Sequence, residues 1–297
     1  LSAHTALSNL SFHTNLLTSL DVSSNTALTT LEGNNNQLTY LNMRNGVTDQ
    51  MVGYFSLLGN NLTCIEVNAD DIDYAAANWT LANGNIDAGV SFADICYASN
   101  PSYTYVPDNN FEQALIDLGY DDVLDDYVLT ANISGVTNLG VNSKSISDLT
   151  GIEDFTALAS LFCAQNLLTS LNVSSNTALT VLDCRANELA SLDVSGATAL
   201  TELYCYANHP LSSLDVSSNV LLTDLIVRDN SLTSLDVSNN TALTNLNCYG
   251  NDLTSLDLSN NTALMSLVCF DNQLTSLDLS NNSALETLSS QDNSLSS

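Results

Sequence analysis

A repeat of 21 residues runs through the second half of this sequence. The copy that begins at Leu232 reads LTSLDVSNNTALTNLNCYGND. One extra residue near His209 and Pro210 is the single change of period. The copies begin at Leu168, Leu189, Leu211, Leu232, Leu253, Leu274 and Leu295. A fixed period of this length predicts a solenoid, in which each coil is stabilised by its neighbours.

Each copy contains two similar halves, LxxLxVxxN and LxxLxCxxN, which end at Asn240 and Asn251 in the copy quoted above. Alternating apolar positions predict a short strand in each half, and successive coils about 4.8 Å apart would pair these strands in parallel. This skeleton is typical of leucine-rich repeats. The expected fold class is therefore a leucine-rich repeat solenoid, with short parallel β-strands in stacked 21-residue coils and a short N-terminal cap helix.

Two columns of the repeat predict structural roles. An asparagine suits a tight turn, because its amide can bond to backbone groups of its own and the next coil. These asparagines are Asn166, Asn187, Asn208, Asn230, Asn251, Asn272 and Asn293. The inward column before them reads Cys163, Cys184, Cys205, Val227, Cys248, Cys269 and Ser290. Replacement by Val and Ser indicates a small buried slot, and the absence of C-x-x-C spacing argues against a metal site.

An aspartate column in the first half of each copy leaves two interpretations open. Carboxylates about 5 Å apart repel one another, so something must offset the repulsion. Hydrogen bonds from nearby Ser, Thr or backbone N–H groups would do so, and so would a row of bound cations such as Ca²⁺. The column reads Asp21, Asn172, Asp193, Asp215, Asp236, Asp257 and Asp278.

The repeats are interrupted once, which predicts two solenoid pieces. The expected divisions are the C-terminal part of a solenoid at 1–62, a C-terminal cap at 63–97, a linker at 98–107, an N-terminal cap at 108–138, and a second solenoid at 139–297 that is truncated at its end. Both ends of the chain fall inside repeat sequence, so we expect it to be part of a longer protein.

The first expected cap contains the two cysteines outside the repeat column, Cys64 and Cys96. A disulfide between them would fit an extracellular chain and would stabilise the cap by roughly 3–4 kcal/mol. The alternative is two free thiols in a cytosolic chain.

The second expected cap should begin with a short helix from Phe111 to Leu118, capped by Asp108 or Asn109 and ended by Gly119. Its apolar residues, Phe111, Leu115 and Leu118, are spaced to share one face.

Charge excludes some classes of partner. The chain has 33 acidic and 4 basic residues, for a net charge of -29. Such a surface repels nucleic acid and anionic lipid, and no apolar run is long enough for membrane insertion. The three histidines have no recognisable catalytic partners, and no Gly-rich phosphate loop or HExxH is present, so we expect no enzyme. The acidic turns at 70–73 and 121–126 lack the EF-hand pattern but leave Ca²⁺ possible there.

The columns on either side of the inward cysteine vary between copies, and alternation places both on the outer face of that strand. They carry Tyr, Phe and Arg, the types enriched at binding surfaces, whereas exposed drift alone would favour Ser, Asn and Asp. We therefore predict a binding strip, with drift at solvent-exposed positions as the alternative. The candidate residues are Asp183, Arg185, Tyr204, Tyr206, Ile226, Arg228, Tyr249, Val268 and Phe270.

The repeat LTSLDVSxNTALTxLxCxxN resembles secreted leucine-rich repeat proteins of Bacteroidota. The segments LTCIEVN…NWT…IDAGVSF…C and YVPDNNFEQALIDLGYDDVLDDYVLT are similar to their C-terminal and N-terminal caps, and SKSISDLTGIEDFTAL resembles internalin-type repeats. Residues 42–60 depart from the pattern. The resemblance implies a secreted or cell-surface protein and identifies no ligand.

The expected function is non-enzymatic binding or adhesion to a protein or glycan at the cell surface or outside the cell. The alternative is a structural subunit of an extracellular fibre, built from tandem or head-to-tail solenoids, in which the partner is another copy of the chain.

Overall fold

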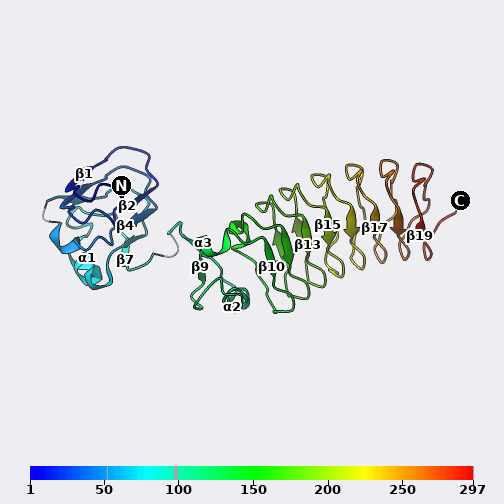
Figure 1. Cartoon of the computed structure of the whole chain (residues 1–297), viewed down its shortest axis with the longest axis horizontal. Coiled ribbons are helices and arrows are strands. Elements are labelled where there is room, and N and C mark those ends of the chain that lie inside the picture. The colour runs from blue at the N-terminus through cyan, green and yellow to red at the C-terminus, as the bar shows by residue number, and fades with distance from the viewer. Residues whose placement is uncertain (52, 97–99, 297) are drawn as a thin grey trace. The chain divides into compact units, whose positions relative to one another are not determined.

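The computed structural model describes residues 1–51, 53–96 and 100–296. They form two compact units, Leu1–Tyr103 and Thr104–Ser297 (Figure 1). Each unit has its own apolar core. The expected boundary between the first cap and the linker, at residues 97 and 98, lies outside the described residues.

A parallel sheet of eight strands runs along the second unit. Each strand is the second half of a coil, and the central leucines pair in register, as Leu203 does with Leu225. In spatial order the strands are β10 (Asn138–Gly140), β11 (Ser160–Phe162), β13 (Val181–Asp183), β15 (Glu202–Tyr204), β16 (Asp224–Ile226), β17 (Asn245–Asn247), β18 (Ser266–Val268) and β19 (Thr287–Ser289). The structure thus confirms the stacked parallel strands of a leucine-rich repeat solenoid.

The first halves of the coils differ from the expectation of a strand in every copy. In the second unit's described repeats, β12 (Ser170–Asn172) and β14 (Ser191–Asp193) form a two-stranded sheet, and the later copies have no strand there. The physical reason is that packing does not require the pairing. Leu235 and Leu256 remain buried in the later copies, so the apolar columns hold these halves in place.

The asparagine column forms the expected hydrogen bonds within each coil and between neighbouring coils. The Asn187 amide donates to the Cys184 carbonyl of its own coil and to the Cys163 carbonyl of the preceding coil, both at 3.0 Å. Its side-chain oxygen accepts from the Leu168 amide at 3.1 Å. Because the carbonyls and amides are buried, this bonding satisfies groups that would otherwise destabilise every turn.

The N-terminal cap of the second unit is built around α2 (Asn109–Asp117). The Asp108 carboxylate caps the helix by accepting from the amides of Asn110 and Phe111. Phe111 and Leu115 are buried as expected. The expectation for Leu118 was wrong, because this residue lies just beyond the helix and is 46% exposed.

Further short elements complete this cap. Strand β8 (Tyr103–Tyr105) pairs with β9 (Tyr127–Leu129), so part of the expected linker at 98–107 is a strand. Helix α3 (Thr130–Ile133) and the 3-10 turn η4 (Ile152–Asp154) precede the regular coils. In the described part of the chain, no helix has the length and apolar character that a membrane crossing requires.

The first unit has the same plan on a smaller scale. Strands β1 (Asn9–Ser11), β3 (Thr30–Glu32) and β5 (Phe55–Ser56) form one sheet. Strands β2 (Ser19–Asp21), β4 (Tyr40–Asn42), β6 (Cys64–Glu66) and β7 (Ser91–Ala93) form the other. The helical segments are η1 (Thr48–Gln50), η2 (Ala69–Asp71) and α1 (Ile72–Asn78).

A disulfide joins Cys64 to Cys96 in this unit. Trp79 is buried at the end of the array, where its ring stacks on Phe55 with centroids 3.9 Å apart. The segment that interrupts the repeats therefore covers the open end of the first core with a large aromatic side chain.

Candidate binding surface

The varying columns of the repeat come together on the outer face of the eight-stranded sheet. One column is the last residue of strands β13, β15, β16, β17 and β18, which are adjacent in the sheet, and the other lies two residues further on, just beyond each strand. In each coil the inward cysteine or valine is fully buried, and the residue after it points outward because the strand alternates. We call the five outward residues after this column the ladder: Arg185, Tyr206, Arg228, Tyr249 and Phe270.

The centre of the ladder is the guanidinium of Arg228. It lies over the Tyr206 ring, 3.8 Å from the centroid, and its other neighbour is the Tyr249 ring at 5.3 Å. Its Nη1 donates to the Tyr249 hydroxyl at 2.8 Å and forms a close ion pair with Asp229. Cation–π contacts of this kind favour the charged form of the arginine and hold it in place.

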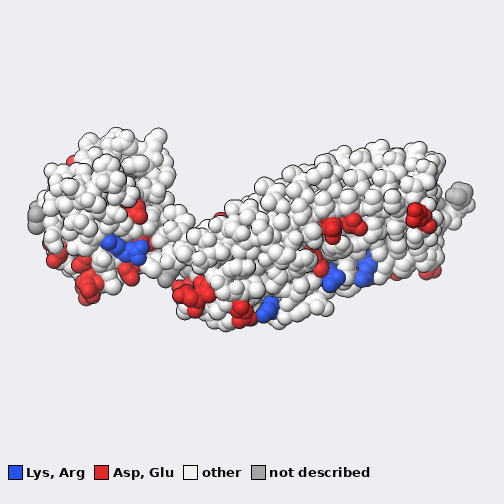
Figure 2. All heavy atoms as spheres, viewed as in Figure 1, with Lys and Arg blue, Asp and Glu red and all other residues white. Residues whose placement is uncertain are grey.

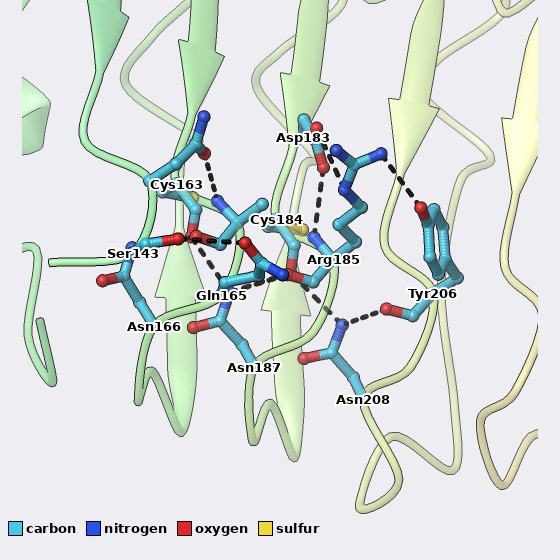
Figure 3. Close-up of polar contacts among 12 residues, drawn as sticks. Ser143, Cys163, Gln165, Asn166, Asp183, Cys184, Arg185, Asn187, Tyr206 and Asn208 are labelled. Carbon is cyan, nitrogen blue, oxygen red and sulfur yellow. Dashed lines mark hydrogen bonds and ion pairs between the residues drawn. The ribbon is translucent and has the colours of Figure 1, made fainter. Parts of the chain in front are cut away.

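The two ends of the ladder differ in chemistry. At one end, the rings of Tyr249 and Phe270 are stacked at 4.3 Å with an angle of 11° between their planes. At the other end, Arg185 donates from Nη1 to the Tyr206 hydroxyl at 2.9 Å, and its Nε lies 3.6 Å from Asp183 (Figure 3). The ladder therefore runs from an apolar end to a cationic end.

These contacts cover one face of each tyrosine ring and place an arginine at each hydroxyl. Arg228 lies against one side of Tyr206, with Arg185 5.5 Å from the ring centroid. Tyr249 is in contact with Phe270 and Arg228. The tyrosines consequently offer a partner their ring edges and hydroxyl groups and no more than one open ring face each.

The column before the cysteines is less exposed than the sequence predicted. Tyr204, Ile226 and Val268 are half-buried, and Asp183 is only 7% exposed. Burial raises the pKa of Asp183, an effect that the Arg185 backbone amide and guanidinium oppose. Burial and the hydrogen bond to Glu202 raise the pKa of Tyr204 to about 12, so its hydroxyl stays neutral at physiological pH.

Two residues of this surface were missed in the sequence. Phe162 of β11 occupies the same column as Asp183 one coil earlier and is half-buried beside it. Reading the column one coil further toward the N-terminus would have found it. Asp229, the partner of Arg228, has a left-handed backbone with φ of 51°. No pattern in the sequence pointed to that ion pair.

Basic side chains are scarce on the whole surface, and those of the second unit lie along one side of the array in Figure 2. Lys144 pairs with Asp117 in the cap at 3.0 Å. The ladder holds the other two cations of this unit, Arg185 and Arg228. The ladder is therefore a local concentration of positive charge on a strongly acidic chain.

The aspartate column is explained by hydrogen bonds. Asp236 accepts from the amide of Ser238 at 2.9 Å, and the column repeats this contact in each copy. The hydroxyl and amide of Ser238 lower the pKa of Asp236, which favours the carboxylate. Within the described residues, no three His, Cys, Asp or Glu side chains are grouped to hold a metal ion.

The thiols of the cysteine column are buried and protonated. Cys163, Cys184, Cys205, Cys248 and Cys269 are free thiols with no exposed surface. Burial raises the pKa of Cys205 to about 12 and that of Cys269 to about 11, so both remain protonated. The thiols act as small apolar side chains in the core.

Sequence comparison finds partial relatives. No protein-family model matches the chain. The chain is 40% identical over 72 residues to internalin J of Listeria monocytogenes serotype 4b (strain F2365), which is 24% of this chain and 8% of the relative. The solved functional domain of internalin J from Listeria monocytogenes, which includes a cysteine ladder, shares 36% identity with a TM-score of 0.54. That match covers 65% of this chain and 48% of the other, so this chain spans about half of that structure.

Two more distant structures share the fold alone. Internalin C2 of Listeria monocytogenes has 21% identity and a TM-score of 0.58, over 67% of this chain and 92% of that one. A leucine-rich repeat protein of Leptospira interrogans has 21% identity and a TM-score of 0.52, over 98% of this chain and 68% of that one. Together with the stacked parallel strands, these likenesses show that the chain has the leucine-rich repeat fold.

Proposed function

We propose that this chain is an extracellular protein-binding module that contacts its partner with the outer face of the eight-stranded sheet. The observation that carries the proposal is the ladder. Its arginines and rings are held by stacking and hydrogen bonds, as in the Arg228 contacts with Tyr206 and Tyr249. Side chains that are ordered before binding lose little conformational entropy when a partner docks. Tyr and Arg are also the residues that most often carry binding energy.

The ring geometry favours a protein over a glycan as the partner. An aromatic platform for a sugar needs an open ring face, and one face of Tyr206 and one face of Tyr249 are occupied by their ladder neighbours. The ring edges and hydroxyls that remain suit apolar and polar side chains of a protein. The similarity to internalins, which are leucine-rich repeat proteins, is consistent with this choice.

The extracellular location rests on chemistry as well as on resemblance. The Cys64–Cys96 disulfide is of the kind that persists in oxidising compartments. The repeats and caps are similar to those of secreted Bacteroidota proteins. The proposed role is non-enzymatic, because the candidate residues form a stacked ladder and not a nucleophile with its base.

The test compares purified extracellular protein domains and a glycan array as targets for the intact chain. We expect a protein binder, whose affinity falls at least about tenfold with Tyr206→Ala and with Tyr249→Ala. The matched control is Ser234→Ala, an exposed substitution in the first half of a coil, which should leave affinity unchanged. Circular dichroism would show that the variants remain folded.

Two results would contradict the proposal. One is binding to glycans alone. The other is a protein binder whose affinity is the same for wild type and both tyrosine variants. The fibre alternative is tested on the same samples by sedimentation velocity: concentration-dependent oligomers lost with Tyr206→Ala would make a second copy of the chain the partner.

A further inference from the structure

The Arg185 end of the ladder has hydrogen-bond donors without acceptors. Arg185 uses Nη1 for the Tyr206 hydroxyl. Its Nη2 donates to no acceptor among the described residues, and its side chain is 44% exposed. The Tyr206 hydroxyl accepts from Arg185, which leaves its own proton to donate, and no acceptor for that proton is present in the described part of the chain. Figure 3 shows the two groups facing each other across neighbouring coils.

Arg185 also has the longest ion pair among the four basic residues. Its ion pair with Asp183 is 3.6 Å long, whereas Arg44 and Lys144 lie 3.4 Å and 3.0 Å from their carboxylates. Arg228 is in closer contact still with Asp229. Arg185 therefore combines a long ion pair, an exposed side chain and an unused donor, which together suit it to an external anion.

We propose that Arg185 and Tyr206 together bind a side-chain carboxylate, from Asp or Glu, on the partner protein. The inference rests on the proposed function and names the chemistry of one contact within it. A carboxylate has two oxygens that can accept from Nη2 of Arg185 and from the Tyr206 hydroxyl at the same time, and charge-assisted bonds of this kind are the strong ones. Arg228 does not compete, because Asp229 and two rings already occupy it.

The composition of the chain makes a direct test possible. It has three arginines, Arg44, Arg185 and Arg228, so an NMR spectrum of arginine Nε–H groups contains three signals. The Arg185→Lys variant assigns its signal. The probe is N-acetyl-glutamate amide, with N-acetyl-glutamine amide as the neutral control of nearly the same shape.

We expect the glutamate probe to shift the Arg185 signal in a saturable way and to leave Arg44 and Arg228 unmoved. The glutamine probe should produce no shift. Tyr206→Phe removes one of the two donors and should weaken binding of the probe about tenfold. Lys144→Gln, which removes a similarly exposed cation that pairs with Asp117 of the cap, should have no effect.

Three outcomes would overturn the inference: no shift of Arg185, equal shifts with both probes, or an Arg228 shift as large as that of Arg185. A sulfate titration is the last arm. If sulfate moves Arg185 at lower concentration than the glutamate probe, the ligand carries a sulfate and not a carboxylate. Failure here leaves the proposed function standing if Tyr206→Ala and Tyr249→Ala still lower the affinity for the partner at least about tenfold, because that result does not depend on the charge of the contact.

Discussion

At the scale of single residues, the asparagine column is what converts the repeat into stacked coils. Asn251 donates to the carbonyls of Val227 and Cys248, each at 3.0 Å, and accepts from the Leu232 amide at 3.0 Å. All three bonds are buried. Removing the amide leaves the Leu232 N–H without a partner, while the two carbonyls each keep one bond, from Asn230 and Asn272. The same geometry in each regular copy explains why this column does not vary.

We expect Asn251→Ala to lower the free energy of unfolding of the second unit by about 1–3 kcal/mol, because a buried N–H left without an acceptor costs about that much. Urea denaturation followed by circular dichroism measures the change. The control is Asn281→Ala, an exposed asparagine with one bond of 3.3 Å, which should cost less than about 1 kcal/mol. Equal losses in the two variants would show that the hydrogen bonds of the asparagine column are not what stabilises the turn.

At the scale of an element, helix α2 carries two carboxylates with opposite titration behaviour. Glu112 is buried, and its Oε1 accepts from the Asp125 amide at 2.8 Å. Burial, with the nearby charges of Asp121 and Asp125, raises the pKa of Glu112. Asp117 is exposed, and hydrogen bonds from Lys144 and Gln113 lower its pKa. In the folded protein, helix α2 therefore favours the neutral form of Glu112 and the charged form of Asp117.

The direction of the Glu112 pKa shift predicts how stability changes with pH. A raised pKa in the folded state gives stability that is present at low pH and is lost as the pH rises through that pKa. We expect Glu112→Gln to keep the bond to Asp125 and to be relatively more stable than wild type at neutral pH, with the advantage shrinking in acid below the ordinary glutamate pKa of 4.5.

Asp117→Asn is the matched control on the same helix. Its lowered pKa contributes stability above the ordinary value of 3.8 that is lost as the pH falls, so this variant should be weaker than wild type at neutral pH and equal to it in acid. Denaturation curves at several pH values measure both. A Glu112→Gln variant that loses stability at neutral pH would contradict the assignment.

At the scale of the whole molecule, the chain contains two separate cores. The first includes Trp79 and the Cys64–Cys96 disulfide, and the second is the long array of leucines and cysteines. Since Trp79 is the one tryptophan of the sequence, its fluorescence reports on the first unit alone. The two cores predict two unfolding transitions that can be shifted independently.

Reduction of the disulfide should shift the unfolding transition of the first unit and leave that of the second unit unchanged. Opening a loop with a sequence separation of 32 should destabilise the first unit by about 3–4 kcal/mol. The tryptophan transition should then occur at lower denaturant, while the main circular dichroism transition of the second unit stays in place. Cys64→Ala/Cys96→Ala should reproduce the shift without reductant. A common shift of both transitions would mean that the units unfold together.

The sequence by itself determined the architecture, because its information is periodic. The leucine spacing requires stacked parallel strands, the constant asparagines require a bonded turn, and the break at Cys64–Cys96 shows where one core is closed. It also predicted that Arg185, Tyr206, Arg228, Tyr249 and Phe270 share one outer face, since they vary where most other columns do not.

Only the tertiary structure decided how those side chains meet. Stacking of Arg228 between two rings and the close pair with Asp229 depend on the spacing of neighbouring coils, which no pattern along the chain specifies. The burial of Asp183 and the exposure of Leu118 likewise depend on what packs beside them. Periodicity dictates which way a side chain points, whereas its neighbours across the coils determine its environment and therefore its chemistry.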